Sequence, residues 1–253
     1  MRVDNSGEVN YNRNIVSSVA PCFFQETPRS PMTSHTHSSR YSKGEEIANS
    51  VTHGIGIVLA IGGLAVLAAF AGRYGNAWHI VSCSIFGAAL ILLYAASTLY
   101  HAVQRPEVKT LLRVLDHSAI LVLIAGTYTP ITLVSLHGPW GWTLFGVIWG
   151  LAALGIIIET TRLRRFHSAM IALYVIMGWA VVAAVKPMML NVGNGGLWLL
   201  LSGGLAYTGG IVFYVWDRLP YNHAIWHLFV LAGSTLHYFA ILLYVIPATH
   251  AAG

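Results

Sequence analysis

Long, charge-poor runs of apolar residues dominate this chain of 253 residues. A helix needs about 20 such residues to cross the hydrocarbon core of a membrane, because it rises only about 1.5 Å per residue. The runs cover residues 49–72, 78–101, 118–136, 140–158, 169–185, 197–216 and 224–246. The Gly-Pro pair at positions 138 and 139 separates the third run from the fourth. The pattern predicts an all-α, polytopic membrane protein that forms a bundle of seven transmembrane helices.

The composition agrees with a membrane protein and excludes several other classes. Hydrophobic residues make up 56% of the chain and charged residues only 9%, whereas a soluble domain carries about 25% charged residues. The net charge of +5 falls mainly in segments between apolar runs, so we expect no nucleic-acid partner. The two cysteines, Cys22 and Cys83, have no paired spacing, which argues against a disulfide framework or a thiolate metal site.

The chain divides into two parts at about residue 42. Residues 1–42 are polar and rich in proline and serine, and they contain no apolar stretch of the kind found in a secretory signal peptide. We therefore expect a disordered polar N-terminal tail. Residues 43–253 are expected to form the seven-helix membrane domain.

The basic residues predict how the helices cross the membrane. If the loops alternate between two faces, most Lys and Arg residues fall on the face that holds the start of the first helix. These are Lys43, Arg105, Lys109, Arg113, Arg162, Arg164, Arg165 and Arg218, against Arg73 and Lys186 on the other face. The positive-inside rule then places the N-terminus in the cytoplasm and the C-terminus outside.

Polar residues that are costly in hydrocarbon gather at that same cytoplasmic face. His53 is expected near the start of the first helix and His101 at the end of the second. Asp116 is expected to start the third helix, and His223 and His227 to open the seventh. Random placement would divide these residues between both faces, so their convergence predicts a single site.

The spacing of the histidines indicates metal binding. His223 and His227 are four residues apart and share one helix face. Together with His101 they supply three nitrogen ligands and leave a fourth position for water, which is the pattern of a catalytic Zn²⁺ site. Asp116 is expected to contact the metal or its water, although pairing with Arg113 is the simpler alternative.

The other polar residues have simpler expected roles. Glu46, Asn49 and His53 share one face of the first helix and are expected to form a supporting polar network. Glu159 is expected to pair with Arg162. The remaining histidines within or beside the apolar runs are expected to pack as hydrogen-bonded side chains; they are His79, His117, His137, His167, His237 and His250.

The motifs of this chain resemble those of a known superfamily. The three segments that carry the resemblance are EIANSVTH at 46–53, STLYH at 97–101 followed by Asp116, and HAIWH at 223–227. They are similar to the three motifs of the progestin and adipoQ receptor superfamily, and in particular to its bacterial branch, the haemolysin III family. The resemblance covers about residues 43–246 and implies an integral protein of the bacterial plasma membrane.

The resemblance also implies an intramembrane zinc site. His101, His223 and His227 would be the ligands, with Asp116 holding the zinc-bound water and Ser97 beside it. Because related alkaline ceramidases hydrolyse a lipid amide, we expect a zinc-dependent hydrolase of an acyl lipid such as a ceramide-like amide. Zn²⁺ would activate the water, Asp116 would transfer its proton, and Ser97 would donate a hydrogen bond to the developing oxyanion.

Two hypotheses of other classes stay open at this point. One is a pore-forming, cytolytic membrane protein, as the family name suggests, although the outer halves of the expected helices carry few polar residues. The other is a receptor or regulatory protein in which Zn²⁺ is structural and ties the second helix to the seventh. The sequence names neither the substrate nor the oligomeric state.

Overall fold

The computed structural model describes residues 41–161, 163 and 166–247, and all but the last two residues of the expected N-terminal tail lie outside these ranges. Within the described residues the regular elements are helices. Seven helical spans are long and apolar enough to cross a membrane. The predicted seven-helix architecture is therefore confirmed.

The spans follow one another with short connections. Four are single helices, and three continue past their α-helix into a π, 3₁₀ or further α segment. The elements are α1 (Lys43–Tyr74), α2 (Ala77–Ala102), α3 (Pro106–Pro130) with η1 (Ile131–Ser135), α4 (Pro139–Thr160), α5 (His167–Trp179) with η3 (Ala180–Ala184) and α6 (Val185–Asn191), α7 (Gly193–Val215), and α8 (Asn222–Ala240) with η4 (Ile241–Val245).

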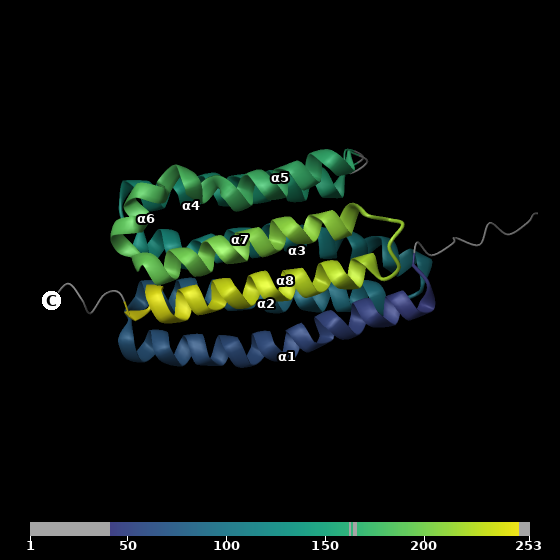
Figure 1. Ribbon diagram of the computed structural model, residues 1–253, viewed down its shortest axis with the longest axis horizontal. Coiled ribbons are helices and arrows are strands. Elements are labelled where there is room, and N and C mark those ends of the chain that lie inside the picture. The colour runs from purple at the N-terminus through teal and green to yellow at the C-terminus, as the bar shows by residue number, and fades with distance from the viewer. Residues whose placement is uncertain (1–40, 162, 164–165, 248–253) are drawn as a thin grey trace, which may run out of the picture. The chain divides into compact units, whose positions relative to one another are not determined.

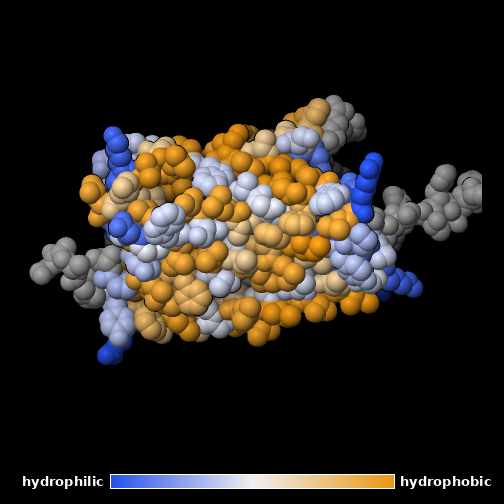
Figure 2. All heavy atoms as spheres, in the orientation of Figure 1, coloured by the Kyte–Doolittle hydropathy of each residue, from blue (hydrophilic) through white to orange (hydrophobic). Residues whose placement is uncertain are grey.

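The helices run alternately up and down the bundle (Figure 1). Sequential neighbours α1 and α2, α2 and α3, and α7 and α8 pack along their lengths, and α8 also contacts α1. One end of the bundle therefore holds the starts of α1, α3, α5 and α8 and the ends of α2, α4 and α7. We call it the α1 end because α1 starts there. In Figure 2 a broad apolar belt separates hydrophilic residues at the two ends, as a bilayer requires.

Helix α1 begins before the apolar run because a capping box starts it. The Ser42 hydroxyl accepts a hydrogen bond from Glu45 N at 3.3 Å, and Glu45 Oε2 accepts one from Ser42 N at 2.8 Å. This exchange satisfies backbone donors that have no partner within the helix. Glu45 Oε1 also accepts a hydrogen bond from Tyr221 N at 3.0 Å, which ties the start of α1 to the start of α8.

The prediction that Asp116 starts the third helix is wrong. Helix α3 begins at Pro106, which occupies the first turn, where its missing N–H costs nothing. The charged residues between Pro106 and Asp116 lie on the first turns of this helix instead of in a loop. Asp116 is consequently held within a regular helix, and it is buried.

The fifth span changes its helical form where a proline interrupts it. Pro187 has no N–H to offer the carbonyl four residues earlier, and its ring crowds that carbonyl. The preceding residues, Ala180–Ala184, adopt a 3₁₀ helix. The Tyr128 hydroxyl donates to Gly178 O at 3.0 Å and accepts from Val181 N at 2.8 Å, so the backbone at the break keeps hydrogen-bonding partners, as hydrocarbon surroundings demand.

Two glycines of α7 permit close packing against α8, whereas the Gly146 and Gly150 pair of α4 has no close neighbour. A Cβ at Gly203 would collide with the His237 ring of α8, and one at Gly210 would lie 2.6 Å from Phe229 Cβ. At Gly146 and Gly150 an added Cβ would meet no atom within 4 Å. The GxxxG pair of α4, a pattern that often marks close helix packing in membranes, therefore packs against no other helix of the described chain.

Removing the Tyr128 hydroxyl should weaken the fold at the helix break. Tyr128→Phe leaves Gly178 O and Val181 N without that partner, which should cost about 1–3 kcal/mol of stability. Thermal unfolding in detergent measures the loss. Tyr74→Phe, at an exposed tyrosine, is the control and should shift stability by less than about 0.5 kcal/mol. Equal melting temperatures for wild type and Tyr128→Phe would contradict this assignment.

Candidate metal centre

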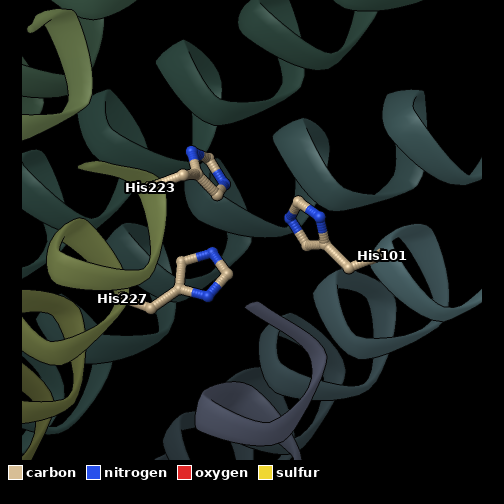
Figure 3. A group of neighbouring side chains, drawn as sticks. All are labelled: His101, His223 and His227. Carbon is tan, nitrogen blue, oxygen red and sulfur yellow. The ribbon is translucent and has the colours of Figure 1, made fainter. Parts of the chain in front are cut away.

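Three buried histidines meet at the α1 end of the bundle. His101 comes from the last turn of α2, and His223 and His227 come from the first turns of α8. Their possible ligand atoms all lie within 4.8 Å of one another, and Figure 3 shows the three rings converging. Because α2 and α8 are far apart in sequence, only packing of the bundle brings these side chains together.

The Nδ1 atom of His101 is held by a carboxylate. It lies 2.6 Å from Glu46 Oε2, and since a carboxylate only accepts, Nδ1–H donates. The opposite nitrogen, Nε2, is buried and has no partner in the described part of the chain. A carboxylate behind the imidazole fixes the tautomer that presents an unprotonated Nε2 to a metal. A bound cation would satisfy this orphaned atom.

The other two histidines show a similar arrangement. Nδ1 of His227 lies 3.2 Å from the backbone carbonyl of Asn49 and 3.1 Å from Thr52 Oγ1. Nδ1 of His223 lies 3.1 Å from the hydroxyl of Tyr41. Each ring is therefore oriented through Nδ1 by a group on or beside α1. Three imidazoles oriented in this way fit a cation that prefers nitrogen ligands, such as Zn²⁺.

Glu46 joins the histidines to a lysine that sequence reasoning did not single out. Its second oxygen, Oε1, accepts a hydrogen bond from Lys109 Nζ at 2.6 Å, and Lys109 Nζ also lies 5.1 Å from the centroid of the Tyr100 ring. Glu46 is only 5% exposed, and a carboxylate buried in this way needs a nearby positive charge and hydrogen bonds. Lys109 lies on the first turns of α3, between His101 and Asp116, and its spacing from Glu46 along the chain offered no signal of this contact.

The expected polar network on α1 lies directly against the histidines. Asn49 is fully buried and its Nδ2 lies 3.4 Å from His101 Nδ1. The His53 ring stacks on the His227 ring, with centroids 3.5 Å apart and planes 11° from parallel. Both ring nitrogens of His53 are buried without a partner among the described residues. The structure thus brings Glu46, Asn49 and His53 together with the metal-ligating candidates.

Asp116 and Ser97 lie in the wall of a cavity next to the histidines. The cavity measures about 140 Å³ and is also lined by His53, His223 and His227. Ser97 lies beside the Asp116 carboxylate, and both residues are buried. Asp116 therefore lies in the same cavity wall as His223 and His227, and its contact with a metal or the metal's water stays a prediction.

The cavity continues toward the middle of the bundle as an apolar space. Apolar side chains of α3, α5, α7 and α8 form most of its wall. A second cavity of about 370 Å³ adjoins it and extends toward the far end of α5, along α6 and the start of α7. Both cavities are lined by Thr127, Tyr128, Gly178, Trp179, Gly204 and His237. An apolar path therefore leads from the histidines along the bundle axis.

Two residues near the start of α1 also contribute to the site without having been predicted. Tyr41 contacts the rings of His101 and His223, with centroid distances of 5.8 Å and 5.1 Å. Thr52 contacts His227. The Thr52 hydroxyl also donates to the Ala48 backbone carbonyl at 2.9 Å, which is a local bond within the helix. The histidine contacts depend on how α1 packs against α8.

Glu159 has a partner that the sequence did not indicate, and its expected pairing with Arg162 is untested. His117 Nδ1 lies 3.1 Å from Glu159 Oε1, so α3 and α4 are linked across the bundle, whereas Arg162 lies outside the described residues. The hydrogen-bonded role expected for His117 is confirmed, with Glu159 as its partner.

Comparison with known proteins identifies the family of this bundle. A family model described as haemolysin-III related matches residues 41–238. The chain belongs to the haemolysin III family. Hemolysin-3 of Bacillus cereus is 49% identical over 203 residues, which cover 80% of this chain and 93% of that protein. The predicted family is therefore confirmed.

More distant relatives extend the similarity to eukaryotes. The human monocyte to macrophage differentiation factor is 32% identical over 207 residues, covering 79% of this chain and 84% of that protein. The rice heptahelical transmembrane protein ADIPOR2 is 29% identical over 151 residues, covering 50% of this chain and 65% of that protein. These similarities support the wider progestin and adipoQ receptor superfamily, and every predicted site residue lies within the region matched by the haemolysin III model.

Loss of the carboxylate behind His101 should weaken metal binding. Glu46→Gln keeps the shape of the side chain but removes its charge, and affinity for Zn²⁺ should fall about 10- to 100-fold. Competition with a chromophoric chelator gives the affinity. Glu107→Gln, at an exposed carboxylate in the first turn of α3, should leave it unchanged. The same affinity in both variants would rule out this role for Glu46.

Proposed function

We propose that this protein is a zinc-dependent intramembrane hydrolase of an acyl lipid, with a ceramide-like amide as the substrate class. One observation carries the proposal: two histidines of the three-histidine cluster, His223 and His227, line an apolar cavity whose wall also holds a buried carboxylate and a hydroxyl. A nitrogen-ligated metal, a proton acceptor and space for a hydrocarbon chain occur together. A purely structural metal site has no need of such a cavity.

The residues around the cavity have distinct proposed roles. His101, His223 and His227 hold the metal, and Glu46, Asn49 and His53 support them. When bound, Zn²⁺ supplies a Lewis acid that lowers the pKa of water and polarises a carbonyl group. The apolar wall holds the acyl chain and excludes bulk water, which strengthens electrostatic interactions inside the cavity.

Asp116 and Ser97 carry the proposed proton transfer and oxyanion contact. The Asp116 carboxylate accepts the proton of the attacking water and delivers it to the leaving amine nitrogen. The Ser97 hydroxyl donates a hydrogen bond to the negative charge that develops on the carbonyl oxygen. Ser97 also orients Asp116, since the two groups are neighbours.

The proposed membrane arrangement follows the basic residues. With most loop Lys and Arg in the cytoplasm, the α1 end and its histidines face the cytoplasm and the C-terminus lies outside. In a bacterium the protein would occupy the plasma membrane, and its acyl-lipid substrate would come from the surrounding bilayer. A reporter enzyme fused after residue 253 distinguishes the two orientations.

Metal content tests the first half of the proposal. Detergent-purified wild-type protein should carry about one zinc ion per chain, and His101→Ala and His227→Ala should each lose it. His137→Ala, at the opposite end of the bundle, should retain zinc. Elemental analysis of chelator-free preparations measures the content. A folded wild-type protein without zinc would overturn the metal assignment.

The rate of lipid hydrolysis tests the second half of the proposal, the enzymatic activity. Zinc-loaded protein should release fatty acid from acyl-lipid amides, and Asp116→Asn should lower the rate about 10²- to 10⁴-fold while keeping its zinc. Ser97→Ala should lower it by up to about 10³-fold. Mass spectrometry of the released fatty acid gives the rates, with His227→Ala as the background.

A structural role for zinc would give a different result. Chelation would then lower the melting temperature, and wild-type protein would hydrolyse no more lipid than His227→Ala. Lysis of liposomes that persists without the three histidines would instead support the cytolytic hypothesis.

A further inference from the structure

A second carboxylate–imidazole pair lies at the α1 end, outside the metal cluster. His117 Nδ1 donates to Glu159 Oε1 at 3.1 Å, just as His101 donates to Glu46. Glu159 is only 3% exposed. A carboxylate buried at this depth in a membrane bundle is costly and points to a function.

The pair orients an imidazole at the cavity wall. His117 lines the cavity that also holds Asp116, His223 and His227, whereas Glu159 does not line it. In the neutral imidazole the bond to Glu159 places the proton on Nδ1, so Nε2 is the nitrogen that can accept hydrogen bonds. The described residues make their hydrogen bond to the His117 ring through Nδ1, and the side chain is 15% exposed. It belongs to no metal-ligating group found there, since that group contains only His101, His223 and His227.

Other groups around His117 hold it in place and add acceptors. The Tyr174 hydroxyl, also in the cavity wall, donates to the backbone carbonyl of His117 at 3.4 Å. The His167 ring contacts the His117 ring edge-on, with centroids 5.9 Å apart, and His167 Nε2 lies 3.2 Å from the Tyr214 hydroxyl. His117 of α3, Tyr174 of α5 and Tyr214 of α7 thus line the cavity, and Glu159 of α4 supports His117 from outside its wall.

We propose that the His117–Glu159 pair forms a headgroup subsite that binds the amine half of the lipid, of the amino-alcohol class. His117 Nε2 and the Asp116 carboxylate are both acceptors, and they match a headgroup rich in hydroxyl and amine donors. The carboxylates of Asp116 and Glu159 repel a fatty-acid carboxylate, because the charges have the same sign. The identity of the substrate as an amide rests on the proposed function.

The subsite also fits the two products of the proposed reaction. Hydrolysis breaks the C–N bond of the amide: the acyl carbon gains the hydroxyl of water, and the nitrogen keeps the electron pair and gains a proton. The amine product becomes an ammonium ion, which the acceptor groups of the His117 side stabilise. The fatty acid becomes an anion, which the subsite repels. Its carboxylate is therefore placed on the side of the histidine cluster.

Direct binding tests the subsite without requiring turnover. The probes are a twelve-carbon 2-amino-1,3-diol and methyl dodecanoate, each with a bromine at the chain end. Bromine quenches tryptophan fluorescence on contact, and Trp179 and Trp226 line the cavity. The full chain is used in detergent, with Glu159→Gln and His117→Phe as test variants. Glu107→Gln and His137→Phe are the matched controls.

The expected result is a selective loss of affinity for the amino diol. Glu159→Gln and His117→Phe should each weaken its binding at least about tenfold, because a hydrogen bond to a charged group is lost. Binding of the donor-free methyl ester should change less than about twofold, and both controls should match wild type. Equal weakening of both probes, or no weakening, would overturn the subsite.

The choice of variant and a separate activity assay keep the subsite testable. If His117→Phe does not yield folded protein, Glu159→Gln decides alone, because it preserves the shape of the side chain. Hydrolysis is assayed separately. Selective binding without turnover would refute the hydrolase and leave the subsite standing, whereas turnover without selective binding would refute only the subsite.

Discussion

Hydrocarbon offers no hydrogen bonds, and this constraint governs the whole structure. Every backbone N–H and C=O in a membrane span must find a partner within the protein, which restricts the spans to helices. Where a helix is interrupted, a side chain compensates, as Tyr128 does beside the 3₁₀ segment Ala180–Ala184. The same constraint makes isolated polar side chains costly, so the buried polar groups of this bundle gather into networks.

The strongest of these networks are built from carboxylates placed behind imidazoles. Glu46 orients His101 and is itself balanced by Lys109. Glu159 orients His117, which lines the cavity. In both pairs the bonded nitrogen is Nδ1, which leaves Nε2 as the nitrogen that could contact a metal or a ligand. One pair therefore supports the histidine cluster and the other supports the cavity wall.

The cavity joins a polar end to a long apolar space inside the bundle. Its polar end holds Asp116, Ser97 and the histidines, whereas the remainder is apolar and follows the bundle axis through residues of α3, α5 and α7. An amphiphile that enters such a space is oriented by its own polarity, because its headgroup is stable only at the polar end. This complementarity is the reason for proposing a lipid as the substrate.

Particular residues show where sequence reasoning succeeded and where it stopped. The seven spans followed from hydrocarbon thickness, and the histidine cluster followed from helical spacing and the alternation of spans. The start of α3 was missed because the charged residues after Pro106 interrupt the apolar run, although the proline itself marks a helix start. The capping box at Ser42 and Glu45 was a readable signal for the earlier start of α1.

Sequence alone determined the helical class, the number of spans and the residue types of the candidate metal centre, because these depend on local composition and on periodicity along one helix. Only the tertiary structure decided which side chains from different helices meet. Lys109 with Glu46, His117 with Glu159, and the stacking of His53 on His227 all join distant segments. Such contacts depend on the rotation and packing of whole helices, and no interval along the chain encodes them.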